Sequence, residues 1–352
     1  MIYHRAKLLN SLAINTFKNC RYSMLEFSVL QLGLQKSENY WWILLDNLDK
    51  ALFQDLSNNC RASFTELGKK YNVSVNTIKT RVETMIEQGL IVHFDVQLKL
   101  SLFNASFALI ILRLKRLLTQ EEKDGIGNHP FITSVSSGIQ KDGMVVAIYR
   151  NNDELNQVVE HVRKNDCVEE LDVFQALPPP SSYVTLPSSK GIESLKKIDW
   201  QILRQLRWNG RMSINELAEK LGRSSPTIRK RLEYMRKQGM LYETVLSNIG
   251  VIGHGFIINF ALQLHELTNE RQLEIEEKVR KIYEDNFWVS WKIVSRPIIF
   301  LTFQVDSVVE AQEIQSRLVS MFPEYQSISQ AISGEWKYYK DFRDQILEDR
   351  SQ

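Results

Sequence analysis

Hydroxyl-bearing and cationic side chains alternate with apolar ones just after position 224. The polar set is Ser225, Thr227, Arg229, Lys230 and Arg236. Hydroxyl groups donate and accept hydrogen bonds, while arginine and lysine attract phosphates. Ile228, Leu232 and Met235 have the spacing of one buried helical face, which leaves the polar set on the other faces. A helix of this kind in a major groove would present them to base edges and phosphates.

Three predicted helices position these side chains. Apolar residues over 198–206 follow one helix face, and Asn209-Gly210 ends that pattern. Ser213, three residues before Glu216, predicts a capping box for a second helix that ends at Gly222. The third helix is predicted to begin at Ser224 or Ser225 and to stop at Gly239. The last two helices predict a helix-turn-helix, and residues 240–246 predict a β-hairpin wing after it.

The same pattern occurs twice in the chain. Residues 48–91 align with 198–241 at a constant offset of 150 without a gap, and 16 of these 44 positions are identical. Such a repeat indicates a duplicated unit. The first copy therefore predicts helices over 48–56, from Ser63 to Tyr71 and from Ser74 to Gly89, with a hairpin wing over 90–96.

The two copies differ in charge. The whole chain has a net charge of only +2. Residues 198–241 hold ten Lys or Arg against four Asp or Glu, a net of +6, whereas residues 48–91 hold six against five, a net of +1. If phosphate neutralisation drives affinity, the second unit should dominate nucleic-acid binding.

Two arginine pairs that are identical in both copies have an alternative role. Arg61/Arg211 and Arg81/Arg231 could equally be ion-pair partners inside their own copies. The acids considered for this role are Glu66/Glu216 and Glu83/Glu233.

A strand, a helix, two strands, a helix and a strand are predicted after each helical unit. In the first copy they span 105–114, 119–128, 131–139, 144–149, 153–164 and 168–177. In the second they span 256–264, 269–283, 288–294, 298–305, 307–321 and 325–332. This β-α-β-β-α-β order is ferredoxin-like, with helices on one face of the sheet. The apolar free face predicts pairing of the two copies or of two chains.

The chain resembles two fused members of the Lrp/AsnC family of prokaryotic transcription regulators. The match rests on residues 199–206, Asn209-Gly210-Arg211, Ser213, Glu216-Leu217-Ala218, Leu221-Gly222, Ser224-Ser225-Pro226-Thr227-Ile228, Arg231, Leu232 and Gln238-Gly239. It covers roughly residues 48–180 and 192–340. The resemblance implies a winged helix-turn-helix that grips double-stranded DNA and a sheet domain that dimerises and often senses amino acids.

Carried over to this sequence, the resemblance implies a set of site residues. DNA contacts are expected at Arg223, Ser224, Ser225, Thr227, Arg229, Lys230, Arg231 and Arg236, and at Ser74, Asn76, Thr77, Lys79 and Arg81. The family's effector hairpin carries a Gly followed shortly by an Asp, for which the first copy offers Gly138 and Asp142. The second copy, Val294-Ser295-Arg296-Pro297, has neither.

The predicted fold class is α+β, with two winged helix-turn-helix domains each followed by a ferredoxin-like domain. The expected divisions are an extension at 1–47, units at 48–100 and 101–178, a Pro/Ser linker at 179–191, units at 192–250 and 251–340, and a tail at 341–352. The extension is expected to form a helix packed on the first unit or, alternatively, an aromatic partner-binding patch around Tyr40-Trp41-Trp42.

Other chemistries have little support in the sequence. Three cysteines in no Cys-x-x-Cys spacing encode neither a disulfide framework nor a zinc site, so no metal or cofactor is expected and a reduced cytoplasmic setting fits best. The apolar runs are too short for a membrane helix. Two alternatives to a DNA-binding regulator remain: a protein-binding winged-helix adaptor, and an enzyme, because heme-pathway decarboxylases with related domains resemble this family. A small-molecule effector is left open as a further partner.

Overall fold

A computed structural model describes residues 45–138, 141–177, 190–248, 256–284 and 286–352. The helix expected within residues 1–47 falls almost entirely outside the described residues. The proline and serine stretch from 178 to 189 also lies outside them.

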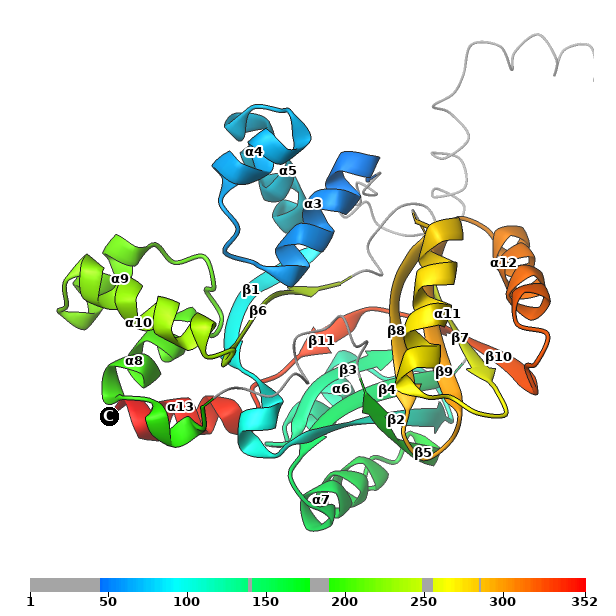
Figure 1. Cartoon of the computed structure of the whole chain (residues 1–352). Coiled ribbons are helices and arrows are strands. Elements are labelled where there is room, and N and C mark those ends of the chain that lie inside the picture. The colour runs from blue at the N-terminus through cyan, green and yellow to red at the C-terminus, as the bar shows by residue number, and fades with distance from the viewer. Residues whose placement is uncertain (1–44, 139–140, 178–189, 249–255, 285) are drawn as a thin grey trace, which may run out of the picture. The chain divides into compact units, whose positions relative to one another are not determined.

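Two three-helix units occur at the predicted places. The first contains α3 (Asn47–Asn58), α4 (Phe64–Tyr71) and α5 (Val75–Glu87), and the second contains α8 (Lys197–Leu206), α9 (Ile214–Leu221) and α10 (Ser225–Lys237). A short 3-10 turn, η2 (Ile192–Ser194), precedes α8. The predicted order of three helices, with the last two forming a helix-turn-helix, is therefore confirmed in both copies (Figure 1).

The helix ends follow local chemistry. The Ser74 and Ser224 hydroxyls accept hydrogen bonds from the N–H groups of Thr77 and Thr227, at 3.0 and 3.4 Å, as N-caps do. Gly222 ends α9 in the left-handed conformation with φ 59°, the region that favours glycine. Ser213 accepts from the Glu216 N–H, but the return bond from the Glu216 side chain is not formed, so only half of the predicted capping box is present. Ser63, at the equivalent position before α4, makes no side-chain capping bond.

The prediction of a separate hairpin wing in each unit is wrong. One strand follows each third helix, β1 (Ile91–Leu98) in the first copy and β6 (Leu241–Ser247) in the second, and the two pair with each other antiparallel. The chain turns after β1 into the 3-10 helix η1 (Leu100–Phe103) and provides no return strand there. Each strand instead satisfies its backbone groups with the strand of the other copy.

The turns before α4 and α9 reinforce this cross-copy pairing. Arg61 donates to the carbonyl oxygens of Gly210 and Met212, and Arg211 donates to those of Cys60 and Ala62. The backbone N–H of Gly210 bonds to the Phe94 carbonyl of β1. A Cβ at Gly210 would lie 2.8 Å from the Phe94 carbonyl carbon, so glycine permits this close approach.

The expectation that Arg61 and Arg211 pair with acids of their own copies is therefore wrong. Their guanidinium groups bind backbone carbonyls of the other copy, and no ion pair is recorded for either among the described residues. Burial lowers the pKa of both side chains.

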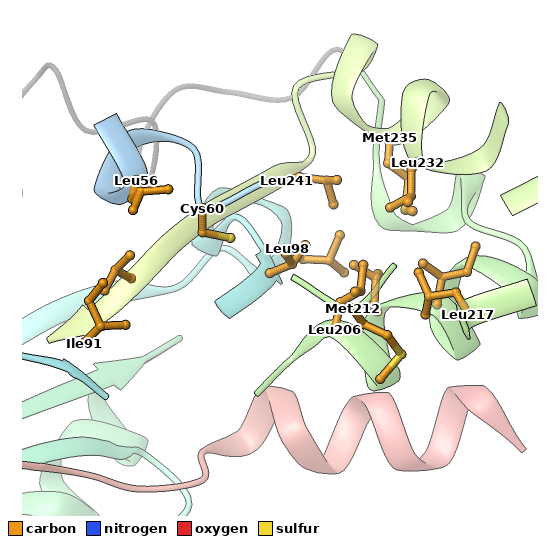
Figure 2. Close-up of a cluster of buried hydrophobic side chains, with 14 of the residues drawn as sticks. Leu56, Cys60, Ile91, Leu98, Leu206, Met212, Leu217, Leu232, Met235 and Leu241 are labelled. Atoms are coloured by element: carbon orange, nitrogen blue, oxygen red, sulfur yellow. The ribbon is translucent and has the colours of Figure 1, made fainter. Parts of the chain in front are cut away.

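The helical units share one hydrophobic core. It contains Leu52, Leu56 and Met85 from the first copy together with Leu206 and Met235 from the second, all at most 1% exposed. Figure 2 shows labelled members of this cluster, from Leu56 and Ile91 in the first copy to Leu217 and Leu232 in the second. Because both copies contribute to one core, neither unit is packed independently of the other.

The two predicted ferredoxin-like orders are confirmed. The first comprises β2 (Ser106–Leu114), α6 (Gln120–Gly127), β3 (Ile132–Ser137), β4 (Asp142–Tyr149), α7 (Asn152–Arg163) and β5 (Val168–Leu177). The second comprises β7 (Phe256–Gln263), α11 (Asn269–Ile282), β8 (Phe287–Ile293), β9 (Ile298–Val305), α12 (Val308–Met321) and β10 (Ser327–Ser333). Apolar side chains on one sheet face pack beneath the helices in two separate cores, one for each copy.

The two sheets join into one. Their nine strands follow the order β10-β7-β9-β8-β5-β2-β4-β3-β11, where β11 is Trp336–Tyr338. The edge strands β10 and β11 are separated by only Gly334 and Glu335, so the sheet must curl until its two edges are close. Across the enclosed space Phe107 contacts Trp291, with ring centroids 5.8 Å apart, and Phe174 contacts Phe300, at 6.4 Å. The free faces of the two copies thus face each other.

The segment expected as a C-terminal tail contains a helix, α13 (Phe342–Ser351), which packs on α8. A buried ionic cluster lies at its start: Arg207, 3% exposed, contacts Asp95 of β1 and also Asp341 and Asp344, at 3.3 and 3.2 Å. Burial lowers the pKa of Arg207, but the three carboxylates together raise it above its ordinary value. The cluster fixes the second unit to the wing strand of the first.

Replacing Arg211 with Met should destabilise the protein, because two carbonyl groups lose a charged donor in a partly buried site. We expect a loss of about 2–3 kcal/mol in the free energy of unfolding, measured by urea denaturation. Arg113→Met is the control, since Arg113 forms an exposed pair with Glu170 and should cost at most about 1 kcal/mol. Equal losses in the two variants would contradict the role of Arg211.

Replacing Arg207 with Met should have a larger effect. Asp95 is fully buried and would lose the cation that it contacts, whereas Asp341 would keep its pair with Arg343. We expect a cost of about 3–5 kcal/mol in unfolding free energy. The same urea experiment measures it. A variant as stable as the parent protein would show that the cluster does not fix the units together.

Candidate nucleic-acid interface

The exposed face of α10 carries free cations. Arg223 precedes the helix, Arg229 and Lys230 lie in its second turn, and all three are exposed. No ion pair is recorded for any of them in the described part of the chain. These three sequence-predicted residues therefore keep their full charge for a partner.

The start of α10 holds the predicted hydroxyl groups close together. The Ser224 and Thr227 hydroxyl oxygens are 2.8 Å apart, and the Ser224 hydroxyl also caps the helix. Ser225 donates to the side-chain oxygen of Asn215 on α9, at 2.9 Å. Asn215 is exposed, and this bond links α9 to the start of α10. The sequence analysis did not single out Asn215, because an asparagine in the first turn of a helix is not distinctive by itself.

Arg231 and Arg81 have a structural task. Arg231 forms a bidentate pair with the fully buried carboxylate of Asp199, at 2.6 and 2.5 Å. Arg81 binds Asp49, the equivalent residue, at 2.7 Å. The hydrogen bond to Asp199 raises the pKa of Arg231. The anticipated structural role is thus found, but its partners are the aspartates on α3 and α8 rather than Glu83 and Glu233.

Arg236 is also engaged. Its guanidinium binds both carboxylate oxygens of Glu243 on β6, at 2.8 and 2.7 Å, and this hydrogen bonding raises its pKa. Glu243 already neutralises this arginine, so a phosphate would have to compete with it. Lys237, in the last turn of α10, is exposed and lay outside the predicted set.

The equivalent face of α5 has a different character. Ser74 caps it by accepting from the Thr77 N–H, as Ser224 does in the second copy. Asn76 and Lys79 are exposed, but the Lys79 ammonium lies 3.6 Å from the Glu83 carboxylate. Two acids, Glu83 and Glu87, balance the two cations of α5, whereas α10 has five cations and one acid. In both copies the predicted hydroxyl groups lie at the start of the third helix, and in the second copy Arg229 and Lys230 add an exposed cationic surface, whereas Arg81, Arg231 and Arg236 bind acids of the fold.

The predicted effector pair lies on the sheet. The Gly138 N–H donates to the Asp142 carbonyl at 2.8 Å, and a Cβ at Gly138 would collide with the Asp142 side chain and the Ile332 carbonyl. Both residues line a cavity of about 280 Å³ between the sheets. The two residues are neighbours, and their effector role stays a prediction.

Groups suited to metal or covalent chemistry are sparse. Among the described residues, no cluster of three His, Cys, Asp or Glu side chains is placed to hold a metal ion. Cys60 and Cys167 are buried free thiols, and burial raises the pKa of Cys60 to about 12. No helix within the described ranges combines the length and apolar character needed to cross a membrane.

Comparison with known proteins identifies the helical units. The winged helix-turn-helix DNA-binding family matches residues 45–92 and again 195–242. A helix-turn-helix-type transcriptional regulator of Pyrococcus furiosus is 28% identical over 135 residues, which cover 38% of this chain and 91% of that protein. The regulatory protein AsnC of Escherichia coli K12 is 44% identical over 54 residues, 15% of this chain and 34% of AsnC.

The chain contains two winged helix-turn-helix units and is similar to regulators of the Lrp/AsnC type. Relatives such as the Pyrococcus protein correspond to little more than a third of it, as expected if each matches one repeat. Over most of its length, the chain is similar in fold to the siroheme decarboxylase NirDL, with a TM-score of 0.54, 11% identity, and coverage of 87% of this chain and 98% of that one. At this identity the likeness concerns the fold alone.

Arg231→Met and Arg229→Met should separate stability from surface charge. Removing Arg231 leaves the buried Asp199 carboxylate unpaired and should lower the unfolding free energy by about 3 kcal/mol. Removing the exposed Arg229 should change it by at most about 0.5 kcal/mol. Urea denaturation of the two variants measures the difference, and similar values would contradict the distinction between these neighbours.

Proposed function

We propose that the protein is a sequence-specific, double-stranded DNA-binding transcription regulator, with α10 as its main recognition helix in the major groove. The observation that carries this proposal is the unpaired, exposed set of Arg223, Arg229 and Lys230 on a capped helix-turn-helix. Lys and Arg supply phosphate contacts, and hydroxyl groups near the helix N-terminus can read base edges. Relatives named as transcriptional regulators support it.

The two units would act as a pseudo-dimer within one chain. The cross-copy pairing of β1 with β6 and the shared core support a fixed relation between the readers. The divisions at 48–100, 101–178, 192–250 and 251–340 remain proposed as units of duplication. A regulator of this kind would work in the cytoplasm, where its DNA is.

Binding should depend mainly on the second copy. Arg229→Ala combined with Lys230→Ala should weaken binding to duplex DNA at least tenfold and lower the slope of log affinity against log salt by about 2, because two phosphate contacts are lost. Lys79→Ala should have a much smaller effect, since Glu83 already offsets that charge. Fluorescence anisotropy with labelled duplexes at several salt concentrations measures both quantities.

A matched control removes the same charge elsewhere. Lys281 and Arg317 are exposed on the second ferredoxin-like domain, and replacing both with Ala also removes two positive charges. This control should leave affinity within about twofold if binding is local to α10. Equal loss in the control, or in Lys79→Ala, would overturn the proposed asymmetry.

The two copies should read different half-sites. The recognition helices begin Val75-Asn76-Thr77 and Ser225-Pro226-Thr227, so the side chains offered to base edges differ. Selection from random duplexes should yield a site whose two halves are not mirror images. A perfect palindrome would instead indicate that two chains dimerise through identical copies.

A protein-binding adaptor is the second candidate, because α5 exposes apolar side chains. Val75 and Ile86 are 43% and 42% exposed on a helix with no net charge. In that case Val75→Ser with Ile86→Ser would abolish partner capture and leave duplex binding unchanged. Discrete sites in genome-wide mapping of bound DNA would favour the regulator.

The only support for the enzyme alternative is the similarity in fold to NirDL. Neither of the two cavities between the sheets is lined by a described histidine or cysteine. Binding of iron-uroporphyrin III, followed by its absorbance, would revive the decarboxylase alternative.

A further inference from the structure

A second enclosed space between the sheets is larger and lies beneath the wing strands. It has a volume of about 350 Å³, within the range of about 300–1,000 Å³ typical of small-molecule sites. Residues of β1 and β6 line one side, the inner faces of both sheets line the others, and β11 closes an edge. The space therefore belongs to both copies.

Aromatic rings line several walls of the cavity. Trp291 and Phe300 come from the second sheet, Phe107 from the first and Trp336 from β11. All four are only partly buried although they lie on inner faces, because the cavity leaves part of each ring uncovered. Flat ring surfaces around a slot suit a planar aromatic ligand.

The polar groups on the sheet walls are already satisfied. Thr302 donates to Asn259 at 2.8 Å, and the Asn259 amide donates to Ser333 at 2.6 Å. Tyr338 donates to the Ser247 carbonyl at 2.6 Å. These groups have little left to offer a ligand.

The polar cluster of Asp95, Gln97 and Arg207, beside strands β1 and β6, has unsatisfied atoms. Arg207 and Gln97 both donate to the same oxygen of Asp95, Oδ2, the latter at 2.9 Å. Asp95 Oδ1, Gln97 Oε1 and Arg207 Nε are buried and have no hydrogen-bond partner. Asp95, Gln97 and Arg207 are 0%, 6% and 3% exposed, and all line the cavity. Orphaned buried polar atoms are costly, and a ligand that pairs with them removes that cost.

We propose that this cavity binds a planar heteroaromatic amine. Its amino group would donate to Asp95 and Gln97, an adjacent ring nitrogen would accept from Arg207, and its ring would stack among Trp336, Trp291 and Phe300. Aminopurines and aminopyrimidines carry this donor–acceptor edge. The proposal concerns ligand binding and is independent of DNA binding.

The test uses 2-aminopurine, whose fluorescence reports stacking, titrated into the full chain without DNA. Saturable binding is expected, with displacement by adenine. Purine, which lacks the amino group, should displace it at least tenfold less well. Absence of saturable binding up to millimolar 2-aminopurine, or equal displacement by purine, would overturn the proposal.

Two variants with matched controls locate the site. Gln97→Met removes one unpaired acceptor and should weaken binding about tenfold. Gln304→Met makes the same change at another buried glutamine whose Oε1 is unpaired but which does not line the cavity, so it should bind like the parent. Equal affinity in the two variants would place the ligand elsewhere and overturn the proposal.

Trp336→Leu provides a second readout that leaves the ionic cluster intact. Loss of ring stacking should weaken 2-aminopurine binding about tenfold. Trp288→Leu is its control, because Trp288 packs on Phe53 outside the cavity. Thermal unfolding of every variant establishes that it is folded. If Gln97→Met does not fold, the tryptophan pair decides, and equal affinity in that pair would overturn the proposal.

Discussion

The pairing of β1 with β6 is the constraint on which the structure depends. Each helical unit supplies a single strand, and a single strand cannot satisfy its own backbone groups. The strand of the other copy satisfies them instead. Arg61 and Arg211 then bind backbone carbonyls in the turn of the other copy, and the buried Arg207 pairs with Asp95 of β1. This exchange holds the two helical units together.

The arginines that are identical in the two copies make contacts inside the fold. Arg61/Arg211 and Arg81/Arg231 are identical pairs, and all four guanidinium groups are occupied by carbonyls or aspartates. On the outer face of the third helix the copies differ at exposed positions, such as Lys79 against Arg229. Duplication therefore preserved the internal contacts, while the outer faces became neutral in one copy and cationic in the other.

Pairing between the two copies also encloses the space between the sheets. The inner faces of the two ferredoxin-like domains meet through rings such as Phe107 and Trp291, and β11 returns to pair with β3 of the first copy. The paired strands β1 and β6 then cover one end of this space. A molecule bound there would touch strands from both helical units, so the cavity and the proposed DNA-reading surfaces share a structural element.

Local patterns in the sequence determined the helix-turn-helix units, the ferredoxin-like order and the cationic face of α10, because caps, periodicity and charge act within a few residues. The partners of strands and buried arginines were decided by the tertiary structure. Residues 240–246 read equally well as half of a hairpin, and Arg211 had acids nearby in sequence. Contacts about 150 residues apart settled both, since a backbone group or a buried charge takes the partner that folding brings to it.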